Sequence, residues 1–199
     1  MMTLIYLHGF LSSPQSRKAT LLADFLAPEK DVAVEVPLLP DKPALALRAA
    51  ERTATSAMGR GAVGLIGSSM GGFYATVLAE RYNLGAVLVN PAVRPHRHLD
   101  LFEGAHTNPY TGAITTIGAS DRAVLAAAQP ARLRPARYWL LVQEGDEVLD
   151  YRDAVAYYHG SKMTVEPGGD HQFQRFERHL PELLKFLQCA TGESASPQQ

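Results

Sequence analysis

The chain has a single cysteine, Cys189, among its 199 residues. One cysteine cannot form a disulfide within the chain, and it cannot supply the thiolate ligands of a structural zinc site. We therefore expect a protein of a reducing compartment that is held together by its hydrophobic core.

Long hydrophobic runs are also missing. No run of about 18 apolar residues occurs anywhere, which argues against a membrane-spanning helix. The first residues, MMTLIYLH, have neither the basic stretch nor the long apolar stretch of a secretory signal. We therefore expect a cytoplasmic protein.

Net charge is nearly absent, at −1, so no long-range field recruits nucleic acid or an anionic membrane. The partner that we expect is a small molecule. A hydrophobic content of 46% over this length is enough to bury one sizeable core.

What the chain does contain is an alternation of two kinds of segment. Short apolar runs rich in β-branched and aromatic residues alternate with stretches of helical periodicity. The runs are 4–7, 32–36, 62–66, 86–89, 138–142 and 163–165, and the helical stretches are 17–26, 44–58, 70–82, 150–158 and 173–187. This order predicts an α/β fold with a mostly parallel sheet of about six strands, helices on both faces, and chemistry at the carboxyl ends of the strands.

The domain organisation follows from the same alternation. Residues 1–189 are predicted to form a single domain, and residues 92–119, which lack a clear period, a short lid-like excursion over the sheet. Residues 190–199 are polar and contain proline and serine, which predicts a disordered tail.

A candidate nucleophile lies in the sequence Gly67-Ser68-Ser69-Met70-Gly71, between an apolar run and a helical stretch. This is the G-x-S-x-G pattern in the strand–turn–helix setting that its chemistry requires. Glycines two residues before and after Ser69 let the strand and helix approach, and the helix N-terminus favours negative charge at the serine. The alternatives are a turn that only closes a βα unit and a phosphate-binding loop, although the Lys-Ser/Thr ending of a P-loop is missing.

Serine needs a histidine base that is itself oriented by a carboxylate, in the chain order Ser, Asp or Glu, His. Asp146 follows the run 138–142 after a turn glycine, and we prefer it as the orienting acid. Its rival Asp150 is better placed to cap the next helix.

His171 is the predicted base. It lies on a glycine-rich loop between the last apolar run and the last helical stretch. His159 and His179 fit less well, because both fall within or at the end of helical stretches.

The loop after the first apolar run is the predicted oxyanion hole. Gly9 permits a tight turn, so that the amides of Phe10 and Met70 donate to one oxyanion, while His8 braces the loop. The residues that we expect around the substrate are Gly9, Leu11, Asn90 and Tyr110.

Three histidines and an aspartate, His96, His98, Asp100 and His106, lie close together in sequence. A zinc site could use such side chains. No further pattern of supporting residues accompanies them, so we favour a solvated loop and expect no metal.

Six blocks in order together resemble the YqiA-type bacterial esterases, compact members of the α/β-hydrolase superfamily, over residues 2–188. The blocks are LHGF with SSP (7–14), GSSMGG (67–72), VNPAVRP (89–95), NPYTG (108–112), GDEVLDY (145–151) and GGDH (168–171). The resemblance implies hydrolysis of short acyl esters or thioesters without metal or organic cofactor, and it places the family's triad on Ser69, Asp146 and His171. One departure is Asp170, at a position where asparagine is more usual in this family. A second carboxylate beside His171 could either raise the pKa of the histidine or compete for its proton.

Two other functions use the same features. An acyltransferase or perhydrolase would share the triad but pass the acyl group to an alcohol or peroxide, and a non-catalytic binding protein could keep the fold without the chemistry. The hydrolase is the function we favour.

Overall fold

The computed structural model describes residues 1–192 of the chain and contains one six-stranded, all-parallel sheet. The strand order is β2-β1-β3-β4-β7-β8. These strands are β1 (Met2–Leu7), β2 (Val32–Glu35), β3 (Ala62–Ser68), β4 (Gly85–Val89), β7 (Tyr138–Gln143) and β8 (Lys162–Glu166). The sheet predicted from the sequence is confirmed, and each predicted strand corresponds to one of its six strands.

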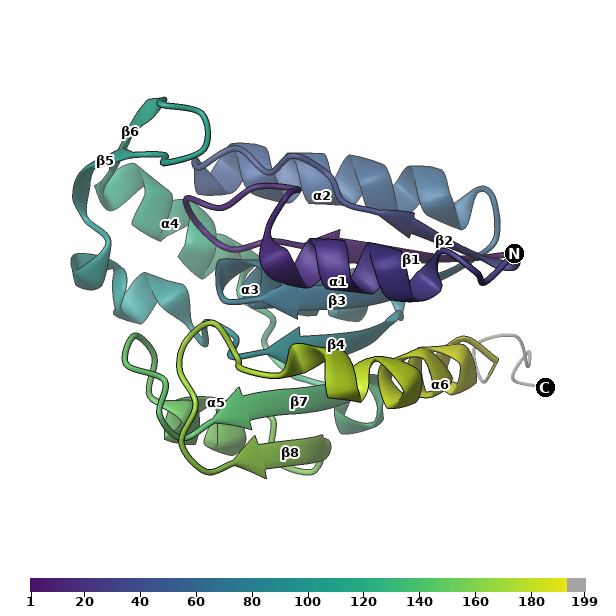
Figure 1. The fold of residues 1–199 in the computed structure, drawn as a ribbon. Coiled ribbons are helices and arrows are strands. Elements are labelled where there is room, and N and C mark those ends of the chain that lie inside the picture. The colour runs from purple at the N-terminus through teal and green to yellow at the C-terminus, as the bar shows by residue number, and fades with distance from the viewer. Residues whose placement is uncertain (193–199) are drawn as a thin grey trace.

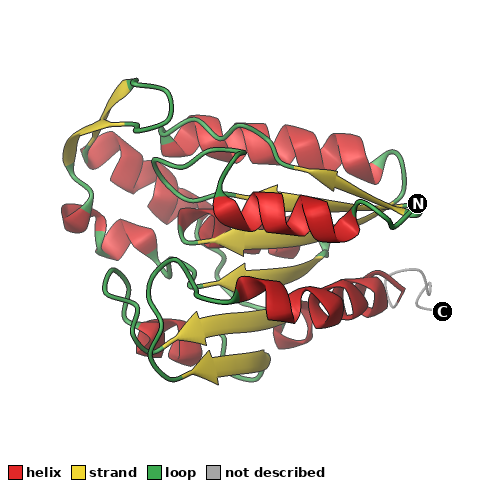
Figure 2. Ribbon diagram, viewed as in Figure 1, coloured by secondary structure: helices red, strands yellow, loops and turns green. Residues whose placement is uncertain are grey.

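Helices cover both faces of the sheet (Figure 1). One face carries α1 (Arg17–Leu26) and α6 (Leu180–Gly192), and the other carries α2 (Pro43–Met58), α3 (Met70–Tyr82), α4 (Ala119–Ala128) and α5 (Tyr151–Tyr157). Figure 2 shows the arrows of the six-stranded sheet pointing the same way, so that the loops at their carboxyl ends gather along one edge. The helices on both faces were also predicted.

Alternate residues of a strand pack into opposite cores. In β1, Leu4 and Tyr6 belong to the core under α1 and α6, whereas Ile5 and Leu7 belong to the core under α2 and α3. A strand that is buried on both faces has an almost continuous run of apolar residues in its sequence. The sequence pattern identified the strands for this reason.

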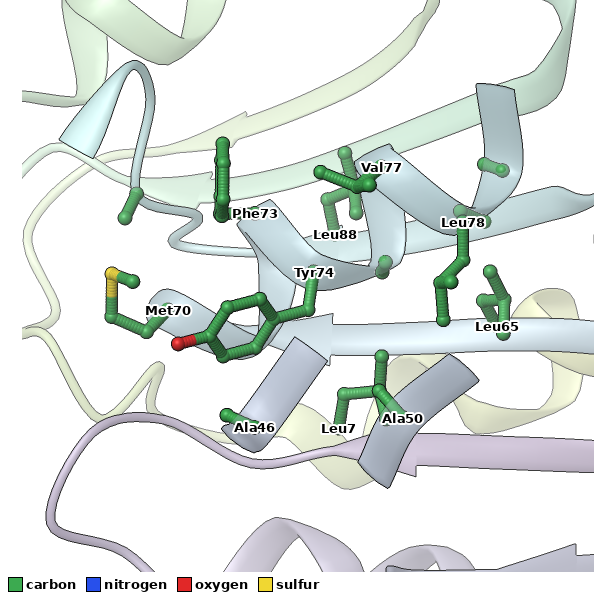
Figure 3. Close-up of a cluster of buried hydrophobic side chains, with 14 of the residues drawn as sticks. Leu7, Ala46, Ala50, Leu65, Met70, Phe73, Tyr74, Val77, Leu78 and Leu88 are labelled. Carbon is green, nitrogen blue, oxygen red and sulfur yellow. The ribbon is translucent and has the colours of Figure 1, made fainter. Parts of the chain in front are cut away.

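Small side chains on α2 let this helix lie close to α3 and the sheet. Ala46 and Ala50 are buried between Leu7 of β1 and Tyr74 of α3 (Figure 3). Tight packing here fixes the start of α3, which follows the candidate nucleophile.

The C-terminal helix differs from the prediction at both ends. Phe173 and Arg175 have positive φ angles, and a 3₁₀ turn covers Phe176–His179, so α6 begins at Leu180 instead of residue 173. At the other end α6 continues to Gly192, because Ala190 packs against Gly85. The prediction of a disordered tail is therefore wrong for residues 190–192. The rest of the predicted tail, 193–199, lies outside the described residues.

The segment 92–119 has more regular structure than the sequence indicated. Two 3₁₀ turns, Pro95–Arg97 and Leu99–Leu101, lead into an antiparallel hairpin of β5 (Gly104–Thr107) and β6 (Ile114–Ile117), which leads into α4. Hydrogen bonds to the β2–α2 connection hold it, from Asn108 Nδ2 to Asp41 Oδ1 (3.0 Å) and from Lys42 Nζ to the Thr116 carbonyl oxygen (2.5 Å). The prediction that this segment acts as a lid stays a prediction.

None of the helices in residues 1–192 has both the length and the apolar character needed to cross a bilayer.

Candidate active site

Ser69 lies in the turn between β3 and α3 with φ 54° and ψ −124°, a strained conformation for a residue with a side chain. The neighbouring glycines make this turn possible. A Cβ atom on Gly71 would overlap the Leu7 carbonyl oxygen, and one on Gly67 would overlap the Gly71 carbonyl oxygen. The steric role predicted for both glycines is confirmed.

The structure brings Ser69, His171 and Asp146 together, although they come from three different loops. His171 Nε2 lies 3.1 Å from Ser69 Oγ, and His171 Nδ1 lies 2.9 Å from each carboxylate oxygen of Asp146. The side chains of His171 and Asp146 are only 16% and 2% exposed. The arrangement is a hydrogen-bonded relay from a buried carboxylate to a serine hydroxyl.

Asp146 is held in its ionised form. Burial alone would raise the pKa of its carboxyl group, but the hydrogen bonds from His171 and from the amides of Leu149 and Val148 outweigh it. The pKa therefore lies below its ordinary value, and a buried carboxylate can stabilise a protonated His171.

The loop predicted to form the oxyanion hole lies directly against the serine. A Cβ atom on Gly9 would be 3.2 Å from Ser69 Cβ, so a side chain at this position would crowd the serine. The amide of Met70 is the first of α3, a position without an intrahelical acceptor, and Phe10 follows Gly9 on the facing loop. These are the two amides that the sequence predicted as donors.

His8 braces this loop, as predicted. Its Nδ1 donates to the Gly9 carbonyl oxygen at 3.0 Å, and its Nε2 accepts from the Leu39 amide at 3.1 Å. Burial lowers the pKa of His8, in agreement with a neutral ring that makes one donor and one acceptor contact.

Asn90 has a different place from the one that the sequence suggested. Its Nδ2 donates to the carbonyl oxygens of Asp170 (2.9 Å) and His171 (3.2 Å), and its Oδ1 accepts from the Gln143 amide (3.0 Å). Its side chain is therefore used to hold the loop of the histidine instead of lining the substrate cavity. The positive φ of 40°, which asparagine tolerates better than most residues, points the side chain across the sheet end.

Gln143, which sequence reasoning missed, holds the same loop from the end of β7. Its Oε1 accepts from the amides of Asp170 (3.2 Å) and Gln174 (2.8 Å), and its Nε2 donates to the Gln174 carbonyl oxygen (3.0 Å). A buried glutamine at the end of an otherwise apolar strand was the available signal.

The other predicted pocket residues fall in different places. Gly9 lines the cavity beside Ser69. Leu11 is half-buried with a φ of 54° in the oxyanion loop. Tyr110 lies in the turn of the β5–β6 hairpin, and it is 58% exposed. Its amide donates to Asn108 Oδ1, and this hydrogen bond turns the chain outward.

Two cavities adjoin the serine and its oxyanion loop. The first, of about 100 Å³, has a polar wall that includes Ser69, His171 and three residues the sequence analysis did not single out, Ser16, Arg17 and Lys18. The second, of about 20 Å³, is mainly apolar. Its wall includes Phe10, Met70, Leu99, Phe102, Ile117 and Leu125.

Asp170 does not compete with Asp146 for His171, contrary to the expectation. Both oxygens of Asp146 contact His171 Nδ1, while Asp170 Oδ2 accepts from Gln174 Nε2 at 2.9 Å. The turn at Gly168 and Gly169, both with positive φ, leads the chain so that these two neighbouring side chains make different contacts.

The residues that the sequence analysis rejected as orienting acid or as base lie elsewhere and make other contacts. Asp150 caps α5 by accepting the amide of Arg152 at 2.9 Å, as predicted. His179 pairs with Glu166 at 3.0 Å, and His159 is exposed.

The histidine-rich stretch does not converge. His106 Nε2 contacts the Phe102 carbonyl oxygen at 2.7 Å, and His98 faces Asp153 at 4.0 Å. In the part of the chain that the structure describes, no three histidine, cysteine, aspartate or glutamate side chains are grouped so that they could hold a metal ion.

A parallel sheet covered on both faces, with a strained serine between β3 and the helix that follows, is the α/β-hydrolase fold. Est1E from Butyrivibrio proteoclasticus is similar, with a TM-score of 0.67 and 15% identity over 98% of this chain and 88% of that one. XC6422 from Xanthomonas campestris, described as an α/β serine hydrolase without lid, has a TM-score of 0.57 and 16% identity over 98% and 84% of the chains. A structure from the metagenome-derived lipolytic enzymes LipS and LipT has a TM-score of 0.68 and 19% identity over 94% of both chains. At these identities the likeness shows the fold.

The chain belongs to the uncharacterised protein family UPF0227, which it matches over residues 3–188. The family match and the similar structures together confirm the resemblance drawn from the sequence, at the level of family and fold.

Proposed function

We propose that this protein is a serine hydrolase that cleaves carboxylic esters or thioesters of short acyl chains. The observation that carries the proposal is the relay in which His171 Nε2 lies 3.1 Å from Ser69 Oγ and Nδ1 contacts the buried Asp146. A serine hydroxyl becomes an effective nucleophile when such a base removes its proton during attack.

The reaction has two halves. Ser69 Oγ bonds to the carbonyl carbon while His171 Nε2 takes its proton, and the amides of Phe10 and Met70 donate to the oxyanion. His171 then gives the proton to the leaving oxygen or sulfur, which departs and leaves an acyl-Ser69. Water, deprotonated by His171, cleaves this ester and restores the serine.

The small apolar cavity supports a short acyl chain. Its volume of about 20 Å³ exceeds only slightly the roughly 10–15 Å³ that one water requires. An acetyl methyl group fits such a space, whereas a long chain needs movement of Phe10 or of the segment above it.

The experiment is hydrolysis of p-nitrophenyl esters of increasing chain length. We expect the acetate to be cleaved best and the variant Ser69→Ala to lose activity by up to about 10⁶-fold. Ser120→Ala, which changes an exposed serine on α4, is the matched control and should keep wild-type rates. Ester cleavage retained in Ser69→Ala would refute the proposal.

A further inference from the structure

The polar cavity beside Ser69 has a cationic wall, which the acyl-transfer chemistry does not itself require. The N-terminus of α1 supplies the N-cap residue Ser16 and the first two helical residues, Arg17 and Lys18, to the same cavity that Ser69 and His171 line. This helix starts without a side-chain cap and without an acidic residue in its first turn. Within the described part of the chain, neither the N-cap residue nor the first turn of this helix therefore offers a negative partner to its first amides and its positive end.

Lys18 is the strongest observation. The residue is 8% exposed, and its Nζ donates to the Gln172 carbonyl oxygen at 2.7 Å. Across residues 1–192, no carboxylate oxygen lies within 4.0 Å of this ammonium group, although Asp170 and Asp146 act on it from further away. A buried ammonium group has three N–H donors, and the Gln172 carbonyl oxygen accepts from one of them. Leaving the other two without acceptors costs free energy.

The cationic surface continues outward. A neighbouring cavity of about 370 Å³ shares Arg17, Lys18 and Gln172 with the first and extends to Arg175. Neither arginine forms an ion pair within the described chain, since the pairs found there involve other residues. Asp170 and Glu177 also line this outer cavity, whereas the described residues that line the polar cavity next to Ser69 include Arg17 and Lys18 but no aspartate or glutamate.

The position of His171 indicates which part of a substrate each of the two cavities receives. His171 must protonate the leaving oxygen, and His171 lines the polar cavity but not the small apolar one. Met70 lines the apolar cavity but not the polar one, and Phe10 lines both. The acyl group therefore fits the apolar side, and the leaving group fits the side of α1.

We infer that the polar cavity binds an anionic group, a carboxylate or a phosphate, carried by the leaving alcohol of the substrate. Lys18, Arg17 and the first amides of α1 are the binding groups. The substrate is then a short-chain acyl ester of a small hydroxy acid or of a phosphorylated alcohol. This inference rests on the proposed hydrolase function and names the substrate class of the same site.

Three acetyl esters test it: those of glycolate, of its neutral isostere glycolamide, and of ethylene glycol monophosphate. In the wild type, kcat/KM for at least one anionic ester should exceed that for the glycolamide ester by at least about tenfold, because charge-assisted contacts are strong. Preference for the glycolate ester identifies a carboxylate site, and preference for the phosphate ester identifies a phosphate site. Equal rates for all three esters would overturn the inference and leave the hydrolase function standing.

Two variants tie the preference to these residues. In Lys18→Met and in Arg17→Gln the ratio of anionic to neutral kcat/KM should fall, whereas Lys30→Met, which removes an exposed lysine beyond α1, should keep the wild-type ratio. Arg17 is exposed, so its variant folds even if removal of Lys18 disturbs the core. An unchanged ratio in Arg17→Gln and in folded Lys18→Met would overturn the assignment.

Direct binding separates this inference from the proposed function. Titration of glycolate and of inorganic phosphate into Ser69→Ala by calorimetry needs no turnover. We expect one of these anions to bind and Lys18→Met in the same background to weaken it by at least about tenfold. Failure of both anions to bind would overturn the anion site, whereas binding without any ester cleavage by the wild type would overturn the hydrolase function alone.

Discussion

Asp146 illustrates how single residues determine this site. Its carboxylate accepts from His171 Nδ1 and from the amides of Val148 and Leu149, and it is almost completely buried. These contacts fix which nitrogen of His171 carries a proton, so that Nε2 is free to accept from Ser69.

Asp146→Asn tests this role. The amide keeps the shape but favours the wrong tautomer of His171, so we expect kcat for p-nitrophenyl acetate to fall by about 10⁴-fold with the fold intact. Circular dichroism and steady-state kinetics measure both. Asp150→Asn, at the cap of α5, is the matched control and should keep wild-type activity. A loss of less than tenfold in Asp146→Asn would mean that this carboxylate does not orient the base.

Lys18 predicts a pH dependence of substrate choice. Burial lowers its pKa to about 8, with opposing contributions from Asp170 and Asp146 and a further lowering by Arg17. The ammonium is charged below this pH and becomes neutral above it, and a bound anion moves the transition upward. We therefore expect the ratio of kcat/KM for the preferred anionic ester to that for the glycolamide ester to decrease as the pH rises past about 8.

The ratio cancels the titration of the triad, which both esters share, and Lys18→Met should abolish the pH dependence. A ratio that stays constant on both sides of this pH, or one that changes equally in Lys18→Met, would contradict the role of this lysine.

At the scale of elements, the strand–turn–helix unit β3–α3 depends on close backbone approach. Gly71 lies against the carbonyl groups of Leu7 and His8 at the end of β1, and Gly72 lies against Pro91. The candidate nucleophile Ser69 is thus positioned by contacts between α3 and the ends of two neighbouring strands.

Gly71→Ala tests this approach. The added methyl group would overlap backbone that cannot move without displacing β1, so we expect destabilisation by more than about 4 kcal/mol or failure to fold. Gly59→Ala at the end of α2 is the control, since its Cβ would meet its nearest neighbour at 3.4 Å with a helical φ of −67°. Urea unfolding should show a change of no more than about 1 kcal/mol for this control. Similar stabilities for the two variants would contradict the steric argument.

At the scale of the whole molecule, the sequence predicted what depends on local pattern. Six apolar runs gave the strands, and the ends of three strands gave Ser69, Asp146 and His171, because parallel strands gather their carboxyl ends at one edge. Chain order and flanking glycines were sufficient to predict which serine, aspartate and histidine side chains lie in contact in the structure.

What the sequence could not predict depends on contacts between distant segments. Lys18 meets the carbonyl of Gln172 across 154 positions, and Asn90 meets that of Asp170 across 80. No periodicity encodes such contacts, because they depend on how α1 and the histidine loop pack over the sheet end. The hairpin in 104–117 was missed because its strands are short and half-exposed, so that they lack a clear apolar pattern.

The single tryptophan, Trp139 of β7, gives a test at this scale. It is fully buried in the core under α1 and α6, and its Nε1 donates to Thr164 at 3.1 Å. Because the loops of Ser69, Asp146 and His171 all extend from this one sheet, we expect tryptophan fluorescence and the proposed esterase activity to be lost at the same urea concentration. Activity lost at clearly lower urea would show that the site loops unfold separately from the sheet.

The central claim is that His171 activates Ser69 as a nucleophile. The most direct measurement is labelling with a fluorophosphonate, followed by intact mass and peptide mapping. The account predicts one adduct on Ser69, none in Ser69→Ala, and labelling slowed by about 100-fold or more in His171→Gln. Labelling of another residue, or equal rates in the wild type and His171→Gln, would contradict it.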